Sequence, residues 1–183
     1  VGIGAMAAVL GLDDDKIIAL CDEASTIGIA EPVNFNSPGQ VVIAGHATAV
    51  SQAVEFAKEH GARRAIILPV SVPSHSSLMR EAGLSLAETL DATDFRTPDV
   101  TVVSAATAEP YVDGPDIRSR LSAQVYSPVL WVRTVEAMIG AGASSIIECG
   151  PGKVLAGLIR RIAKGTPVAF IDNLDGLQKA MQG

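Results

Sequence analysis

The chain has 183 residues, of which 48% are hydrophobic and 19% charged, and its formal net charge is -6. This length and apolar content suit one domain of ordinary size or two small ones with real cores, and the negative charge offers nucleic acid or an anionic membrane no bulk attraction. The sequence lacks both the apolar run of roughly 18 residues that spans a bilayer and the basic start of a signal peptide. We therefore expect a soluble, cytoplasmic protein that binds neither nucleic acid nor membrane.

The first third of the chain predicts six elements in the order β-α-β-β-α-β. They are an apolar strand over 4–11, a helix capped by residues 13–15 with apolar positions Ile17, Ile18 and Cys21, two strands within 31–45 around the turn 37–39, a helix over 48–60 and a buried strand within 64–72. This order is typical of a split βαβ, or ferredoxin-like, unit, which we expect to fill residues 1–70.

The remainder of the chain alternates between helical and strand patterns. We expect helices over 78–90, 115–125, 131–139 and 154–163, and strands over 100–104, 145–149 and 167–171. Such alternation predicts a parallel sheet covered on both faces. Three strands make an incomplete sheet of this kind, so we expect it to take further strands from outside the 183 residues.

The two cysteines and the histidines show no metal-ligand or redox spacing, so the sequence predicts no metal site. We expect Cys21 and Cys149 to be reduced and buried. Cys149 is a poor candidate nucleophile because the neighbouring Glu148 raises the energy of a thiolate.

His75 is the candidate catalytic residue. It follows the apolar run 64–72 and Pro73, which cannot continue a sheet ladder, so we expect it on the turn beyond a strand end. Histidine titrates near neutral pH, and one held on such a turn is suited to act as a general acid or base. These residues supply no nucleophile, so they leave open that His75 is only a hydrogen-bonded loop histidine.

Four phrases, in their order and spacing, resemble the malonyl-CoA:acyl carrier protein transacylases of bacterial fatty-acid synthesis. They are PVNFNSPGQVVIAG at 32–45, LPVSVPSHSSLM at 68–79, QVYSPVLW at 124–131 and ECGPGKVL at 148–155. The resemblance covers nearly the whole chain and implies an α/β fold of two subdomains. Residues 1–70 would be a ferredoxin-like small subdomain, and residues 71–183 the C-terminal part of an α/β-hydrolase-like large subdomain with a parallel sheet.

The resemblance also implies an activity. Members of the family move a malonyl group from malonyl-CoA to the phosphopantetheine thiol of acyl carrier protein through a seryl ester, in a ping-pong cycle without a further cofactor. His75 matches the family's general base, and Gln124, 49 residues later, matches the residue whose backbone carbonyl orients it. The family's serine in G-H-S-x-G, its malonyl-binding arginine and its oxyanion-loop glutamine precede this stretch. None of these motifs occurs here, so we expect the chain to be inactive without that N-terminal half as its partner.

The resemblance points to two further groups of residues. Asn34 and Asn36 match asparagines near the family's site, and Ser74 and Val72 match its pocket wall. All four have the alternative of forming turns. The acidic carrier protein needs a basic patch on this acidic chain, and the densest basic group is Arg160, Arg161, Lys164 and Lys153. The alternative is a solvated helix end that complements the helix dipole.

Two other functions remain as alternatives at this point. One is an acyltransferase domain of a polyketide synthase, which the same fold supports. The other is a non-catalytic binding module built on the ferredoxin-like part, for which replacement of His75 would change no activity.

Overall fold

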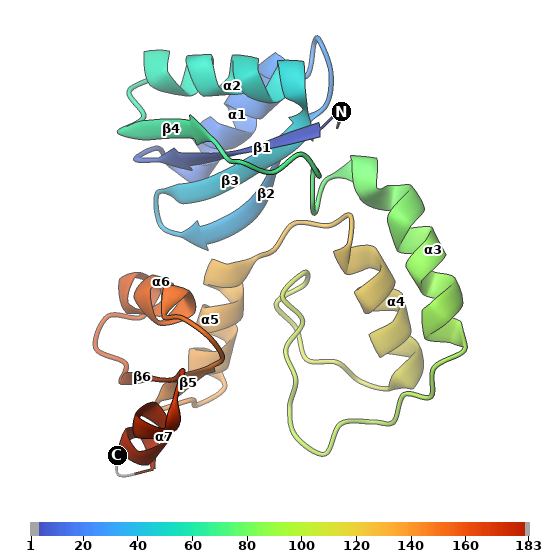
Figure 1. Ribbon diagram of the computed structural model, residues 1–183, viewed down its shortest axis with the longest axis vertical. Helices are drawn as coiled ribbons and strands as arrows, with labels where there is room; N and C mark the ends of the chain where they lie inside the picture. Colours follow the sequence, from blue (N-terminus) through green and yellow to red (C-terminus); the bar gives the residue numbers. More distant parts are fainter. Residues whose placement is uncertain (1–3, 182–183) are drawn as a thin grey trace.

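The computed structural model describes residues 4–181, and their first six elements build a four-stranded sheet with two helices. These elements are β1 (Gly4–Leu10), α1 (Asp14–Ala24), β2 (Ala30–Ser37), β3 (Gln40–His46), α2 (Ala47–Glu59) and β4 (Arg64–Ile67). The strands pair antiparallel throughout, in the order β2-β3-β1-β4. Figure 1 shows α1 and α2 together on one face of this sheet. The expected β-α-β-β-α-β order is therefore confirmed.

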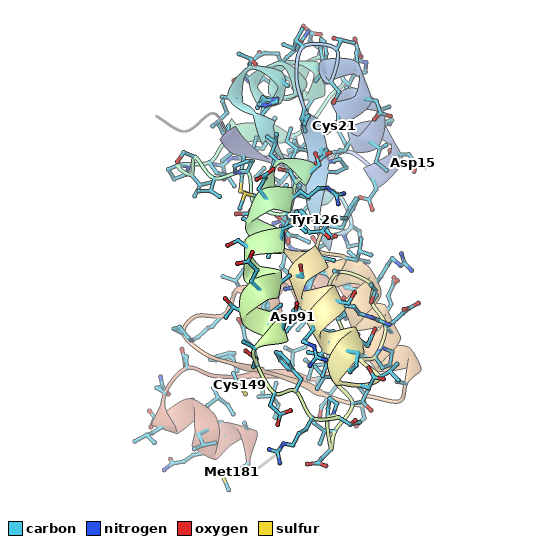
Figure 2. The ribbon with its side chains drawn as sticks, turned by 90° about the vertical axis from the view of Figure 1, so that its right-hand side faces the viewer. Asp15, Cys21, Asp91, Tyr126, Cys149 and Met181 are labelled. Carbon is cyan, nitrogen blue, oxygen red and sulfur yellow. The ribbon has the colours of Figure 1, made fainter. Side chains whose placement is uncertain are left out.

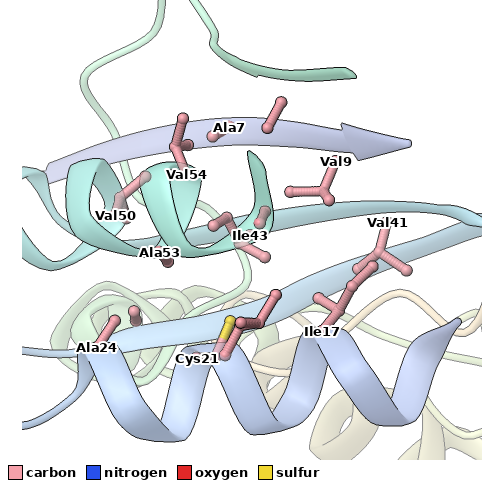
Figure 3. Close-up of a cluster of buried hydrophobic side chains, with 14 of the residues drawn as sticks. Ala7, Val9, Ile17, Cys21, Ala24, Val41, Ile43, Val50, Ala53 and Val54 are labelled. Carbon is pink, nitrogen blue, oxygen red and sulfur yellow. The ribbon is translucent and has the colours of Figure 1, made fainter. Parts of the chain in front are cut away.

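The main core lies between this sheet and the two helices (Figure 3). Helix α2 buries Val50, Ala53, Val54 and Ala57, which are the four positions that its 3.6-residue period places on one face. Helix α1 begins after Asp13, whose side chain accepts a hydrogen bond from the Lys16 N–H at 2.9 Å, and it buries Ile17, Leu20, Cys21 and Ala24. Of the three apolar positions named from the sequence, Ile17 and Cys21 are buried and Ile18 is 40% exposed.

Strand β4 corrects the expectation of a long buried strand over 64–72. It ends at Ile67, and the side chains of Ile66 and Ile67 are 39% and 52% exposed. The cause is position, because β4 pairs only with β1 at the edge of the sheet, and Pro69 has no N–H with which to extend the ladder.

The second part of the chain contains mostly helices. Its elements are the single-turn 3₁₀ helix η1 (Ser77–Met79), α3 (Arg80–Asp91), α4 (Gly114–Gln124), α5 (Trp131–Gly140), β5 (Ile146–Cys149), α6 (Val154–Ile162), β6 (Val168–Ile171) and α7 (Leu174–Ala180). Strands β5 and β6 pair in parallel, so the fold is mixed α/β with one antiparallel sheet and one parallel pair. The sequence patterns predicted all of these elements except η1, which was included in the helix expected over 78–90, and α7, which is seven residues long.

Two expectations for this part are wrong. Residues 100–104 form no strand, and their only ladder contact is an isolated bridge between Val103 and Pro110. Val100 and Val102 are 73% and 42% exposed, because no strand among residues 4–181 lies beside them. The parallel sheet is also not covered on both faces, since β5 and β6 stand alone and their residues are at most half-buried.

None of the helices within residues 4–181 combines the length and the apolar character that a bilayer span requires.

Candidate active site

His75 lies on the loop between β4 and η1, as the sequence predicted, and its backbone is left-handed with φ at +66°. A residue other than glycine pays roughly 1–2 kcal/mol for this conformation, so its surroundings must hold it there. The loop is short and stiff, with Pro69 and Pro73 on one side of His75 and η1 on the other.

The His75 ring is oriented by the end of α4. Its Nδ1 lies 2.9 Å from the backbone carbonyl oxygen of Gln124, and its backbone N–H donates to the carbonyl oxygen of Val125 at 3.2 Å. Because a carbonyl oxygen only accepts, the proton of a neutral ring sits on Nδ1, and Nε2 carries the free lone pair. The ring is partly buried. This geometry presents Nε2 in a fixed direction, with a backbone carbonyl oxygen as the partner of Nδ1.

Gln124 is placed by the packing of α4 against α3 (Figure 2). The helices approach closely at Gly83, where a Cβ would lie 2.5 Å from the Tyr126 ring. Ser122 donates its hydroxyl to the Gly83 carbonyl oxygen at 2.8 Å, and the Arg80 guanidinium lies 4.7 Å from the centre of the Tyr126 ring. Since α3 begins five residues after His75, His75 and the Gln124 carbonyl are connected through the α3–α4 helix pair.

The same loop is held on its other side by the four-stranded sheet. Gly4 at the start of β1 packs so tightly on Pro73 that a Cβ would lie 2.5 Å from the proline Cδ. Ser76 is buried and donates its hydroxyl to the Pro73 carbonyl oxygen at 2.6 Å. The Ser77 N–H donates to the Glu31 carboxylate of β2 at 2.7 Å. Sequence reasoning missed the role of Gly4 and Glu31 at this loop, because their contacts are with residues far along the chain.

The four expected pocket residues lie in two places. Ser74 and Val72 are next to His75, where the Ser74 N–H donates to the Val72 carbonyl oxygen at 2.9 Å and the Val72 side chain is exposed. Asn34 and Asn36 lie on β2, where the register with β3 shifts twice. Asn34 also forms a parallel bridge with Val129, five residues after Gln124. The bulged strand and the segment after α4 are therefore neighbours.

The four basic residues lie on and around α6, which Figure 1 shows apart from the start of α3. All four are exposed, yet three also contact the chain itself. Arg160 donates to the Val168 carbonyl oxygen at 3.2 Å, and Arg161 donates to the Gln40 side-chain oxygen at 2.8 Å. The Lys153 ammonium lies 4.1 Å from the centre of the Phe170 ring and 3.8 Å from the Asp172 carboxylate.

Both cysteines are free, but only one is buried as expected. Burial, with smaller contributions from the carboxylates of Asp22 and Glu31, raises the pKa of the Cys21 thiol to about 12. Cys149 is exposed, contrary to the prediction, because it ends a strand whose outer face is not covered.

Comparisons with known proteins give one consistent result. No family model matches the chain. It is 45% identical over 181 residues to the malonyl CoA-acyl carrier protein transacylase of Escherichia coli (strain K12), which covers 99% of this chain and 59% of that protein. The crystal structure of an acyl-carrier-protein S-malonyltransferase from Burkholderia pseudomallei superposes with a TM-score of 0.98 at 45% identity, over 100% of this chain and 59% of that one. A malonyl-transacylase in complex with its type II PKS acyl-carrier protein gives a TM-score of 0.96 at 41% identity, over 99% and 59%.

The matched proteins are all of one class, the acyltransferases, and they share the mixed α/β fold of this chain. Within that class, the relatives and solved structures that the chain resembles are malonyl-CoA:acyl carrier protein transacylases. The chain spans about three fifths of the length of the relatives that it matches.

Proposed function

We propose that this chain is the C-terminal portion of a malonyl-CoA:acyl carrier protein transacylase, and that His75 is its general base. The observation that carries the proposal is the 2.9 Å contact between His75 Nδ1 and the Gln124 carbonyl oxygen, which leaves Nε2 as the basic nitrogen. The 45% identity to a transacylase over almost the whole chain supports the same proposal.

The proposed chemistry has two half-reactions. His75 Nε2 takes the proton of a serine hydroxyl as the serine oxygen attacks the malonyl thioester carbonyl, and it returns that proton to the departing thiolate of coenzyme A. In the second half, Nε2 takes the proton of the phosphopantetheine thiol, whose sulfur attacks the seryl ester. The proton then returns to the serine oxygen. The Gln124 carbonyl holds the ring tautomer without adding a charge, and no cofactor is needed besides the thioester substrate.

The remaining machinery belongs to the part of the family's sequence outside these 183 residues. There we place the serine nucleophile, the arginine for the malonyl carboxylate and the oxyanion-loop glutamine. We further propose that residues 1–70 are a ferredoxin-like small subdomain, which the strand order β2-β3-β1-β4 supports. Residues 71–183 would then form the C-terminal part of an α/β-hydrolase-like subdomain. The cytoplasmic setting expected from the sequence is part of the same proposal.

Asn34, Asn36, Ser74 and Val72 are proposed to line the acyl pocket. Support comes from the bridge between Asn34 and Val129, which brings β2 next to the segment that follows Gln124, and from the position of Ser74 and Val72 beside His75. Side-chain size at Val72 and Ser74 would then influence which acyl group fits.

The test of the base uses the natural polypeptide that contains this chain. We expect one malonyl unit in its intact mass after exposure to malonyl-CoA, and a fall in transacylation of about 10²- to 10⁴-fold for His75→Ala. Gln124→Ala, which keeps the backbone carbonyl, is the matched control and should retain most of the activity. Full activity in His75→Ala would contradict the proposal and favour a non-catalytic binding module.

We also propose that Arg160, Arg161, Lys164 and Lys153 form the docking surface for the acidic carrier protein. Charge reversal of Arg160 and Arg161 should raise the KM for carrier protein and leave hydrolysis of malonyl-CoA unchanged. Arg96→Glu, on the loop between α3 and α4, is the net-charge control for each of the two reversals made singly. Gln40→Ala is a control for the loss of the Arg161 contact alone. An unchanged KM in the double reversal, or an equal rise in Gln40→Ala, would overturn the assignment.

A further inference from the structure

The loop that carries His75 is held by hydrogen bonds from two directions. From one side, the end of α4 accepts from the His75 ring and backbone at the carbonyl oxygens of Gln124 and Val125. From the opposite side comes one side chain, Glu31 of β2, whose carboxylate accepts from the Ser77 N–H at 2.7 Å. Glu31 is thus a charged tie between the four-stranded sheet and the segment two residues after His75.

The acceptor and the donor suit each other chemically. Ser77 is the first residue of η1, which continues directly into α3, and the N–H groups of a first turn have no partner within their own helix. A carboxylate is the strongest acceptor available for such an N–H, and its charge complements the positive end of the helix dipole. Neither residue is part of the proton transfer proposed above.

The position of this tie matters because His75 is in an unfavourable backbone conformation. With φ at +66°, the residue would relax toward negative φ if the loop were free, and rotation of its backbone would carry Nδ1 away from the Gln124 carbonyl oxygen. Fixing the residues on both sides of His75 prevents this relaxation. The buried Ser76 hydroxyl on Pro73 and the Glu31 carboxylate on Ser77 do this from adjacent positions.

We propose that Glu31 is a positioning residue for the base: its bond to the Ser77 N–H holds His75 in the left-handed conformation that keeps the ring on the Gln124 carbonyl. The catalytic part of this inference rests on the proposed role of His75, while the structural part, the order of the ring and of the Ser77 amide, does not. Glu31 thereby also couples the placement of β2 to the direction of Nε2.

Three variants of the natural polypeptide isolate the bond. Glu31→Ala removes the acceptor, and Glu31→Gln keeps an acceptor oxygen without the charge. Ser77→Pro removes the donor, and its site suits proline, because the position is the first of a helix and the preceding Ser76 is extended at φ -94° and ψ 164°. Glu59→Ala, at an exposed glutamate that ends α2, is the control for loss of one negative charge.

We expect Glu31→Ala to lower kcat about tenfold with the KM for malonyl-CoA changed less than twofold, because misplacing a catalytic group slows the reaction without weakening binding. Ser77→Pro should lower kcat similarly, and the double variant Glu31→Ala/Ser77→Pro should be no slower than either one. Glu31→Gln should recover most of kcat. The Ser77 amide should exchange its hydrogen faster in Glu31→Ala, and the His75 Nδ1–H resonance should broaden.

An unchanged kcat in Glu31→Ala, multiplying effects in the double variant, or equal losses in Glu31→Ala and Glu31→Gln would overturn the inference. The two proposals fail differently. If His75→Ala remains active, the base assignment fails, while the amide exchange still tests the tie. If His75→Ala is inactive and Glu31→Ala leaves kcat and the ring resonance unchanged, the positioning role of Glu31 is excluded and the base assignment stands.

Discussion

The four-stranded region, residues 4–68, and the C-terminal region, residues 100–181, differ in how they bury apolar side chains. The two hydrophobic core clusters found within residues 4–181 consist of residues from the four-stranded region. The C-terminal region buries a few side chains such as Val135 and Ile159, while Val100, Ile147 and Val154 face outward. A β-α-β-β-α-β order thus closes a core from local patterns, whereas a parallel sheet needs more strands than the described part of this region has.

The largest difference in stability should come from replacing one isoleucine of each region by alanine. Ile43→Ala removes a fully buried side chain of β3 and should lower the free energy of unfolding by about 2–5 kcal/mol. Ile147→Ala, on the exposed side of β5, should lower it by less than about 1 kcal/mol, because little area is lost from contact. Urea unfolding of the 183-residue chain measures both values. Equal losses would mean that the two regions form one core.

A pair of helical glycines compares α6 of the C-terminal region with α3, which lies between the two regions. Gly83→Ala drives a methyl group into the Tyr126 ring and should cost about 1–3 kcal/mol. Gly157→Ala in α6 meets no atom within 4 Å and should stabilise by about 0.5–1 kcal/mol through helix propensity. Thermal unfolding shows whether each variant is less or more stable than the wild type. Stabilisation by Gly83→Ala would show that α3 and α4 do not need their close approach.

Removing a helix cap in each region should give a smaller difference in stability. Asp13 caps α1 in the four-stranded region, and Asn173 caps α7 with a 2.9 Å bond to the Gly176 N–H. Asp13→Ala should lower the urea midpoint of the whole chain, because α1 is part of the main core. Asn173→Ala should only speed amide exchange within α7. A common shift of the midpoint in both variants would contradict this separation.

The Asp13 cap also predicts an acid dependence. Its hydrogen bond from the Lys16 N–H, above all, lowers the pKa of the Asp13 carboxyl below its usual 3.8. A carboxyl with a lowered folded pKa stabilises the fold above its unfolded pKa and loses that contribution as the pH falls. Wild-type stability should therefore drop toward Asp13→Ala below about pH 4. A constant difference in stability between the wild type and Asp13→Ala down to pH 2 would exclude a contribution from the charged Asp13 cap.

The smallest expected effect concerns the two cysteines, and its test needs no substitution. At pH 8, iodoacetamide should label Cys149 and leave Cys21 unmodified until the chain unfolds, because the exposed thiol is accessible and the buried one holds its proton. The raised pKa of Cys21 also means that stability should fall as the pH rises above 9, where the unfolded thiol ionises and the folded one does not. Mass spectrometry locates the label, and rapid labelling of native Cys21 would contradict its burial.

The difference between the two regions also explains which elements could be predicted from the sequence. The hairpin at Pro38-Gly39 and the apolar face of α2 depend on local chemistry, and both were predicted. Residues 100–104 have β-branched side chains, but the described part of the chain places no strand beside them, and a strand pattern alone does not supply one.

At the site, the turn position of His75 followed from Pro73, while its pairing with Gln124 was expected only from the family resemblance. Glu31 gave no signal, because its partner is a backbone N–H that lies 46 residues away. Contacts of this kind depend on how the two regions meet, and no local pattern records that.

The bridge at Asn34 has a further consequence. The Phe35 N–H donates to the Val129 carbonyl oxygen at 2.9 Å, and the Val129 N–H donates to Val33 at 2.8 Å, so the chain itself occupies the outer edge of β2. At the opposite edge, β4 is four residues long and is followed by Pro69. Unpaired strand edges are the usual templates for intermolecular β-sheet growth. With one edge covered and the other short, the four-stranded region offers a second copy little backbone to pair with, which protects it against aggregation.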